Sequence, residues 1–331
     1  MLPKRNIKSR TLRFPIIYLR AALCLATVLL SGTEGRASQL NLPPDATEAI
    51  RLMYSGRTDQ AIAMARNLEA ARPEHPLGYL IEADVLWWKI YCKLLERKYS
   101  TIDSWSRQRA PDPDDDAYLA LADKVTRLAE AGIAKSDSAE MELYAGLGYA
   151  SRARLTGLHY EKIATARAGV EARKHLLRCL ELDPDMADAN LGLGLYNYYV
   201  DTLSSMAKVL RFFMGIPGGD KRVGLRQLET AATKAEMVQI EARFNLAKNL
   251  RNYDFDYARA STAAAPLTSD FPDNPVFLLL AGDIAEKLGH KDEALVRFRA
   301  AAAAPMEDVK CGERVQRIAR EALAALGATS K

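Results

Sequence analysis

Histidine, cysteine and serine are the side chains from which metal sites and nucleophilic catalysts are most often built. The histidines lie far apart in the sequence, at His75, His159, His175 and His290. No two of them form the His-Glu-x-x-His pattern of zinc enzymes, and no Gly-x-Ser-x-Gly turn exposes a nucleophilic serine. We therefore expect no metal site, no cofactor and no catalytic site, and we predict that the protein is not an enzyme.

Two other segments have the composition of ligand-binding loops. The first, Gly215-Ile-Pro-Gly-Gly-Asp-Lys-Arg222, is rich in glycine, as are phosphate-binding loops ahead of a helix. It lacks the preceding strand and the Lys-Ser or Lys-Thr ending of a phosphate loop, so we predict a turn with Asp220 capping the helix that begins at Lys221. The acidic run at 112–116 lacks the alternation of a calcium loop and suits the start of a helix near Ala117.

The first 37 residues have the layout of an export signal. Six basic residues and no acidic residue occupy positions 1–20, an apolar run follows at 21–30, and small residues flank Arg36. We predict cleavage after Ala37 and a periplasmic or secreted protein. Ten apolar residues form only about 15 Å of helix, which is too short to span a hydrocarbon core of about 30 Å. An N-terminal membrane anchor is therefore the less favoured alternative.

The charge of the chain changes sign when this segment is removed. The full sequence has 331 residues, with 46 basic and 42 acidic side chains and a net charge of +4. Seven of the basic residues and one acidic residue lie in residues 1–37, which leaves a net charge of −2 for residues 38–331. Because the basic excess belongs to the export signal, we expect no nucleic-acid partner.

Three cysteines follow the export signal: Cys92, Cys179 and Cys311. An exported protein could oxidise one pair, but these wide spacings are not those of a disulfide framework or a zinc knuckle. We therefore expect the three cysteines to be small apolar residues that pack between helices.

The spacing of apolar residues predicts an all-α protein. From about residue 45 onward they recur every three or four positions, and alternating strand-like runs are missing. Proline, glycine, aspartate and asparagine interrupt this pattern at short intervals, where one helix ends and the next begins.

The clearest repeating unit lies at 275–306. Small residues stand where its two helices would cross, a glycine stands at the turn, and one large residue would fill the hole between units. In these positions the segment resembles the tetratricopeptide repeat (TPR) family of 34-residue antiparallel helix pairs, through Ala281, Gly282, Gly289, Ala294, Phe298 and Ala301.

The same spacing recurs in four other segments. The matching positions are Gly56, Ala61, Ala65, Leu68 and Pro73; Ala172, Leu176, Cys179 and Pro184; Gly194, Gly224, Leu228 and Ala231; and Ala260, Ala264, Leu267 and Pro272. This resemblance implies a TPR-like α-solenoid over residues 38–331, with insertions near 84–116 and 198–220. The amphipathic segment Val309–Leu326 is expected to be the C-terminal capping helix.

The second insertion contains an apolar helical face made of Met206, Val209, Leu210, Phe213 and Met214. This face could pack onto the solenoid, bind a partner protein, or touch a membrane interface through residues 206–214. Packing onto the solenoid is the reading that we favour.

TPR geometry implies an extended groove lined by the first helix of each pair. The groove-facing positions near residue 245 fall on Asn245, Asn249, Asn252 and Tyr253, and those of the preceding pair on Asp188, Tyr198 and Tyr199. Amide side chains both donate and accept hydrogen bonds, so this face could hold an extended peptide backbone or a carboxylate. The alternative is that the asparagines are solvated or bridge adjacent helices.

The resemblance implies a non-enzymatic scaffold that binds a peptide or a partner protein in this groove. The competing predictions are an accessory subunit of an envelope transport or assembly complex, and an enzyme with an unrecognised site.

Overall fold

The computed structural model describes residue 40, residues 42–104 and residues 112–327, without the side chains at 206, 209, 210 and 213. Residues 1–37 and 38–331 form separate units. The predicted export signal and its cleavage point lie outside the described residues.

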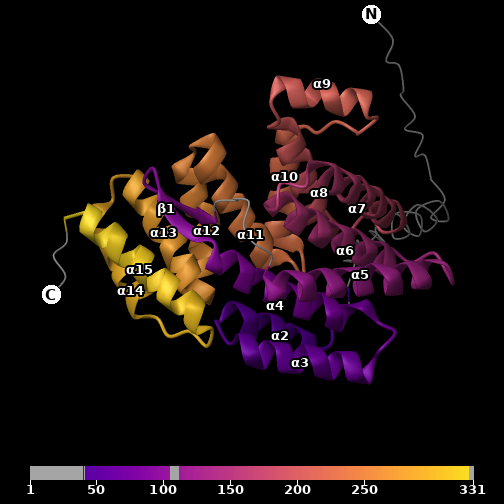
Figure 1. Ribbon diagram of the computed structural model, residues 1–331, viewed down its shortest axis with the longest axis horizontal. Coiled ribbons are helices and arrows are strands. Elements are labelled where there is room, and N and C mark those ends of the chain that lie inside the picture. Colours follow the sequence, from indigo (N-terminus) through magenta and orange to yellow (C-terminus); the bar gives the residue numbers. More distant parts are fainter. Residues whose placement is uncertain (1–39, 41, 105–111, 328–331) are drawn as a thin grey trace, which may run out of the picture. The chain divides into compact units, whose positions relative to one another are not determined.

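Helices in consecutive pairs make up the second unit (Figure 1). The pairs are α2 (Pro44–Tyr54) with α3 (Thr58–Ala71), α4 (Pro76–Lys93) with α5 (Pro113–Ile133), α6 (Ala139–Leu158) with α7 (Lys162–Leu182), α8 (Ala189–Asp201) with α10 (Lys221–Lys234), α11 (Gln239–Asn249) with α12 (Tyr257–Asp270), and α13 (Pro275–Lys287) with α14 (Lys291–Ala303). The helix α15 (Val309–Ala325) follows the last pair. The predicted all-α solenoid of helix pairs is confirmed.

Small residues allow the helices of a pair to cross closely. A Cβ atom added at Gly224 of α10 would lie 2.7 Å from the Gly194 carbonyl oxygen and 2.7 Å from the Tyr198 nitrogen of α8. In the last pair, a Cβ atom at Gly282 would lie 2.7 Å from the ring of Phe298, which is fully buried. The small and large positions of the repeat pattern therefore have the packing roles that the sequence predicted.

Polar caps start the helices at the interruptions of the pattern. The Asp220 carboxylate accepts hydrogen bonds from the backbone N–H groups of Arg222 and Val223, as predicted. Asp112 and Asp115 form a capping box at the start of α5, so this helix begins at Pro113, earlier than the position near Ala117 that was expected. Each cap satisfies N–H groups that have no partner within the helix.

The first insertion contains a β-hairpin, which the sequence analysis did not expect. Strand β1 (Leu95–Lys98) pairs in antiparallel register with β2 (Thr101–Ser104). Each strand has only four residues, and consecutive charged residues at 96–98 obscure any alternation. The hairpin packs against α13 and α15, so long-range contacts stabilise it and local propensity does not.

The second insertion forms α9 (Ser205–Phe213). Four of the five side chains in its predicted apolar face, those at 206, 209, 210 and 213, lie outside the described part, and Met214 is 46% exposed. A hydrogen bond of 2.9 Å from the Tyr196 hydroxyl to the Pro217 carbonyl ties the return loop to α8. No helix among the described residues is long and apolar enough to cross a bilayer.

The C-terminal helix α15 covers the end of the array, as predicted. Its inner face buries Val315, Ile318, Ala319 and Ala322. The start of this helix is also joined covalently to the end of α4, because Cys92 and Cys311 form a disulfide with a Cα–Cα distance of 5.4 Å. The expectation that all three cysteines are apolar packing residues is therefore wrong for this pair, whereas Cys179 is a buried free cysteine.

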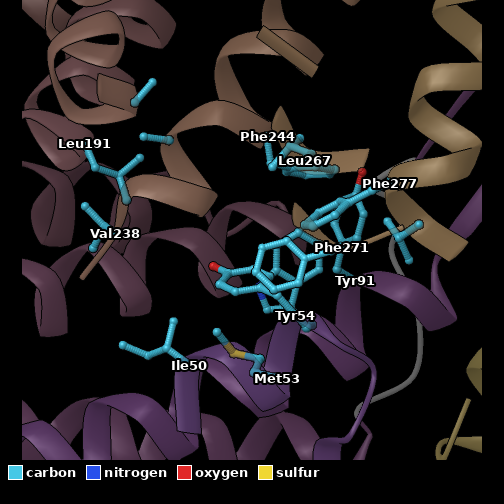
Figure 2. Close-up of a cluster of buried hydrophobic side chains, with 14 of the residues drawn as sticks. Ile50, Met53, Tyr54, Tyr91, Leu191, Val238, Phe244, Leu267, Phe271 and Phe277 are labelled. Carbon is cyan, nitrogen blue, oxygen red and sulfur yellow. The ribbon is translucent and has the colours of Figure 1, made fainter. Parts of the chain in front are cut away.

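Aromatic side chains from early and late helix pairs meet in one buried cluster (Figure 2). The Trp88 ring of α4 lies 4.9 Å from the Phe244 ring of α11, and the Tyr54 ring of α2 lies 5.9 Å from the Phe277 ring of α13. The Asn274 side chain also donates a 2.7 Å hydrogen bond to the Tyr54 carbonyl. The inner faces of α2, α4, α11 and α13 therefore pack on one another, where the sequence analysis expected an open groove.

Candidate functional site

Asp188, one of the predicted groove residues, is buried and holds the start of α11. Its Oδ1 accepts hydrogen bonds from the backbone N–H groups of Met237 and Val238 at 2.8 and 3.0 Å, and its Oδ2 accepts from Glu236 at 3.0 Å. The side chain is satisfied by backbone donors and has an exposed fraction of 2%. The prediction that Asp188 faces an accessible groove is wrong.

Three other predicted residues are also buried. Asn245 donates to the Glu241 carbonyl of its own helix. Asn249, with an exposed fraction of 0%, accepts a 2.8 Å hydrogen bond from the Tyr199 hydroxyl. Tyr198, also 0% exposed, donates a 2.6 Å hydrogen bond to Asp254. Tyr198 and Asn249 thus bridge neighbouring helices, which for Asn249 is the alternative that the sequence left open, whereas Asn245 bonds within its own helix.

One predicted residue, Tyr253, and the neighbouring Phe255 reach the surface through a change in helix geometry. A short π-helix, η1 (Leu250–Asp254), continues α11, and it ends at Phe255 in the left-handed conformation with φ of 54°. Tyr253 is 50% exposed and Phe255 is 68% exposed. Single π turns and left-handed bulky residues are uncommon and are found often at functional sites.

An accessible aromatic surface results, which we call the tyrosine surface: Tyr199, Asn252, Tyr253 and Phe255. The Tyr199 and Tyr253 rings lie 6.1 Å apart and nearly perpendicular to each other. The buried Tyr198 ring lies 5.5 Å from Tyr199 and 6.1 Å from Tyr253, again edge to face. Edge-to-face packing of three rings holds the two accessible tyrosines in a fixed arrangement.

A cation and an unpaired amide group lie beside the tyrosine surface. The Lys248 ammonium is 5.7 Å from the Tyr91 ring centre. Burial acts to lower the pKa of Lys248, but Tyr199, Asp103 and Tyr253 outweigh this effect and raise it. The Nδ2 atom of the neighbouring Asn249 is buried without a hydrogen-bond partner. Because Asn249 is 0% exposed, Lys248 is the cationic donor that this site can offer to a ligand.

A second polar cluster joins α4, α6 and α11 through Arg154. The two Arg154 Nη atoms lie 2.6 Å from the Glu241 carboxylate and 3.0 Å from the Asp84 carboxylate, and the guanidinium stacks 4.3 Å from the Trp87 ring centre. Arg154 also donates to the Tyr118 hydroxyl at 2.8 Å. Burial and the nearby Glu241 raise the pKa of Asp84 to about 7, although Arg154 opposes them.

This Arg154 cluster is a tie between distant helix pairs, because each of its charged groups already has a partner. The histidines also pair singly with carboxylates, as in the 2.6 Å contact between His175 Nδ1 and Glu142. Within the described residues, no group of three or more histidine, cysteine, aspartate or glutamate side chains is placed to hold a metal ion.

Comparisons with known proteins give little information about this chain. No protein-family model matches it, and no curated protein matches it. Among solved structures, the TPR domain of P58(IPK) matches over 85% of this chain and 98% of that chain, with 13% sequence identity and a TM-score of 0.23. Because the TM-score is low, the description of the fold above rests on the helices of this chain alone.

Tyr199, Asn252 and Tyr253 were thus predicted from their spacing, whereas Lys248 and Phe255 were not. Lys248 follows no motif, and its position beside Tyr199 depends on how α8 packs on α11. The run Asn-Tyr-Asp-Phe-Asp at 252–256 interrupts the apolar pattern after α11, and this was the one available signal that the helix ends irregularly there.

Proposed function

We propose that this chain is an exported, non-enzymatic scaffold that binds a protein partner at the tyrosine surface. The observation that carries the proposal is the half-exposed Tyr253, which is packed against Tyr199 and the buried Tyr198. Aromatic side chains that are held rigidly lose little conformational entropy on binding, and they dominate the energetics of many interfaces. The array of helix pairs supports the same function, since such arrays present extended surfaces to other proteins.

The chemistry of the surface favours an extended peptide segment that carries a carboxylate. Lys248 supplies a positive charge, and the Tyr199 and Tyr253 hydroxyls supply polar groups beside the rings, whereas the Asn252 amide is bonded to Arg251 and Asp103. Asn249 is inaccessible and acts by orienting the Tyr199 hydroxyl. A carboxylate placed next to Lys248 would form a charge-assisted hydrogen bond, which is stronger than a neutral one.

Export is supported by the Cys92–Cys311 disulfide, because stable disulfides form in oxidising compartments and are rare in reducing ones. The predicted signal at 1–37 would deliver the chain to such a compartment. Cell fractionation together with N-terminal sequencing tests this part: a periplasmic or secreted product that starts at Ser38 is expected. A cytosolic product with an intact N-terminus would contradict it.

The binding surface is tested by placing a photoreactive amino acid at Tyr253 and crosslinking in intact cells. A discrete protein adduct is expected at this position. The matched control is Val296 on α14, which is 61% exposed and belongs to the second helix of its pair. Once the partner has been identified, Tyr253→Ser should weaken the affinity of the protein for it at least tenfold, whereas Val296→Ser should leave the affinity unchanged. Equal effects of the two substitutions would exclude the tyrosine surface as the binding site.

A further inference from the structure

Charged side chains of two helices hold the main chain of strand β2. Lys98 and Thr101 face each other next to the turn of the hairpin, and Arg97 faces Ile102 one step further on. Opposed pairs in antiparallel sheets alternate between bonded and unbonded, so the peptide groups of Ile102 point away from β1. Arg251 Nη2 donates to the Ile102 carbonyl at 2.6 Å, and the Ile102 N–H donates to Asp283 Oδ2 at 3.3 Å.

We call the three charged residues Arg251, Asp283 and Lys287 the strand clamp. Arg251 Nη1 lies 2.6 Å from Asp283 Oδ2, and Lys287 Nζ lies 3.1 Å from Asp283 Oδ1 and also donates to the Ser100 carbonyl. Arg251 is 1% exposed and Asp283 is 0% exposed. The hydrogen bonds from the clamp to the hairpin are to main-chain atoms, and Arg251 also lies 3.9 Å from the Asp103 carboxylate of β2. The clamp can therefore hold an extended main-chain segment, with a preference for an acidic side chain at the position of Asp103.

The hairpin that fills the clamp is strained at its turn. Tyr99 and Ser100 both have positive φ angles, 49° and 57°. This conformation is usual for glycine and asparagine in two-residue turns and costs other residues about 1–2 kcal/mol each. The buried side chains of Leu95 and Ile102 oppose opening by about 1.5–3 kcal/mol each. Strain and apolar burial are thus of similar size, and a two-stranded hairpin is marginal without support.

We propose that the strand clamp is a second binding site, which takes an extended main-chain segment of a partner protein, and that β2 occupies it in the free protein. The segment replaces β2, and Arg251 and Lys287 donate to its carbonyl groups while Asp283 accepts from its N–H. The Cys92–Cys311 disulfide ends three residues before β1 and keeps α4 fixed to α15 when the hairpin leaves.

The strand clamp lies beside the tyrosine surface and is linked to it through Asn252. The Asn252 amide, part of that surface, donates a hydrogen bond to the Asp103 carboxylate of β2. Asp103 also accepts a 2.8 Å hydrogen bond from the Tyr91 hydroxyl. Displacement of β2 therefore frees the Asn252 amide, which becomes available to a segment that contacts both sites.

Native-state hydrogen exchange on the full chain tests whether β2 can leave. The amides of Ile102 and of the cross-strand pairs should exchange at least tenfold faster than those of α13. Lys287→Met should accelerate hairpin exchange a further threefold or more without changing α13, and the exposed Lys291→Met is the control that should change neither. If the hairpin amides exchange no faster than those of α13 in every variant, the proposal is overturned.

Binding in trans tests whether the emptied clamp takes a strand. The probe is a fluorescent peptide with the sequence of residues 98–104, and the protein is the full chain with Ile102→Pro, which removes the donor of β2. The probe should bind this variant at least tenfold more tightly than the unaltered chain, and a probe with proline at the isoleucine position should not bind. No difference between the two chains, with the helical circular dichroism signal intact, would overturn the proposal. If the signal is lost, the exchange experiment decides.

Discussion

Removal of the Cys92–Cys311 disulfide is the perturbation whose effect can be worked out most directly. The bond joins the end of α4 to the start of α15 across 219 residues of sequence. In the chain-entropy view, a loop of that length restricts the unfolded state by about 5 kcal/mol, and losses measured for native disulfides are about 2–5 kcal/mol. We expect Cys92→Ala with Cys311→Ala to lower the free energy of unfolding by about 2–5 kcal/mol.

The corresponding shift in melting temperature follows from the size of the folded unit. About 280 residues are described, and an unfolding entropy of about 2.1 cal/mol/K per residue converts this loss into a decrease of about 3–8 °C. Thermal unfolding followed by circular dichroism, with and without a reductant, measures it. The unaltered chain in reductant should melt close to the double variant, and the double variant should not respond to reductant.

Cys179 provides the internal control, since it is fully buried and unpaired. Cys179→Ala should keep the response to reductant, and each single variant at Cys92 or Cys311 should lose as much stability as the double variant, because either change removes the same bond. Thiol titration of the unfolded, unreduced chain lacking residues 1–37 should detect one thiol. Three thiols, or no response of the melting temperature to reductant, would refute the reasoning.

Three further predictions use other contacts of the helix array. Burial raises the pKa of Asp84 from 3.8 to about 7, so between these pH values the folded chain holds a proton there that the unfolded chain releases. The free energy of unfolding should therefore fall as the pH rises from about 4 to 7. Asp84→Asn should flatten this decrease and raise the free energy of unfolding by about 1–3 kcal/mol at pH 8, as measured by urea unfolding at several pH values. Gly224→Ala places a methyl group 2.7 Å from the backbone of α8 and should destabilise by about 1–3 kcal/mol, whereas Gly312→Ala, whose Cβ atom meets nothing closer than 3.6 Å, should be neutral or stabilising. Asn249→Ala with Asn252→Ala should lower the melting temperature, since Asn249 is buried and Asn252 bonds to Asp103; an unchanged melting temperature would show that these amides do not bridge the helices.

The helix pairs could be predicted because their signals are local. The crossing at Gly194 and Gly224, the cap at Asp220 and the packing of Phe298 each depend on a few residues close in sequence or on one neighbouring helix. The repeated spacing of small and apolar residues therefore predicts the helix pairs, and it also predicts which face of α15 is buried. The hairpin escaped prediction because its order comes from the strand clamp, which is far away in sequence.

The candidate site could be predicted only in part, for two physical reasons. The groove positions were placed by assuming a regular α-helix, and the π-helix after Asn249 changes the direction of the side chains that follow. They were also placed by assuming an open array, whereas the contact of Trp88 with Phe244 and the contact of Arg154 with Glu241 join segments about 90 to 160 residues apart. A local sequence pattern cannot predict contacts over such distances in sequence. For the same reason, the pairing of Cys92 with Cys311 could not be predicted.

The contact of α2 and α4 with α11, α13 and α15 has an evolutionary consequence. Repeat arrays commonly gain or lose a unit by duplication or deletion, because each unit touches only its neighbours. Here a duplicated or deleted pair would shift Phe277 away from Tyr54 and Cys311 away from Cys92. Such a change would separate the aromatic cluster and leave two cysteines unpaired. The number of helix pairs in this protein is therefore constrained, and its descendants should vary in loops and insertions, with the count of repeats preserved.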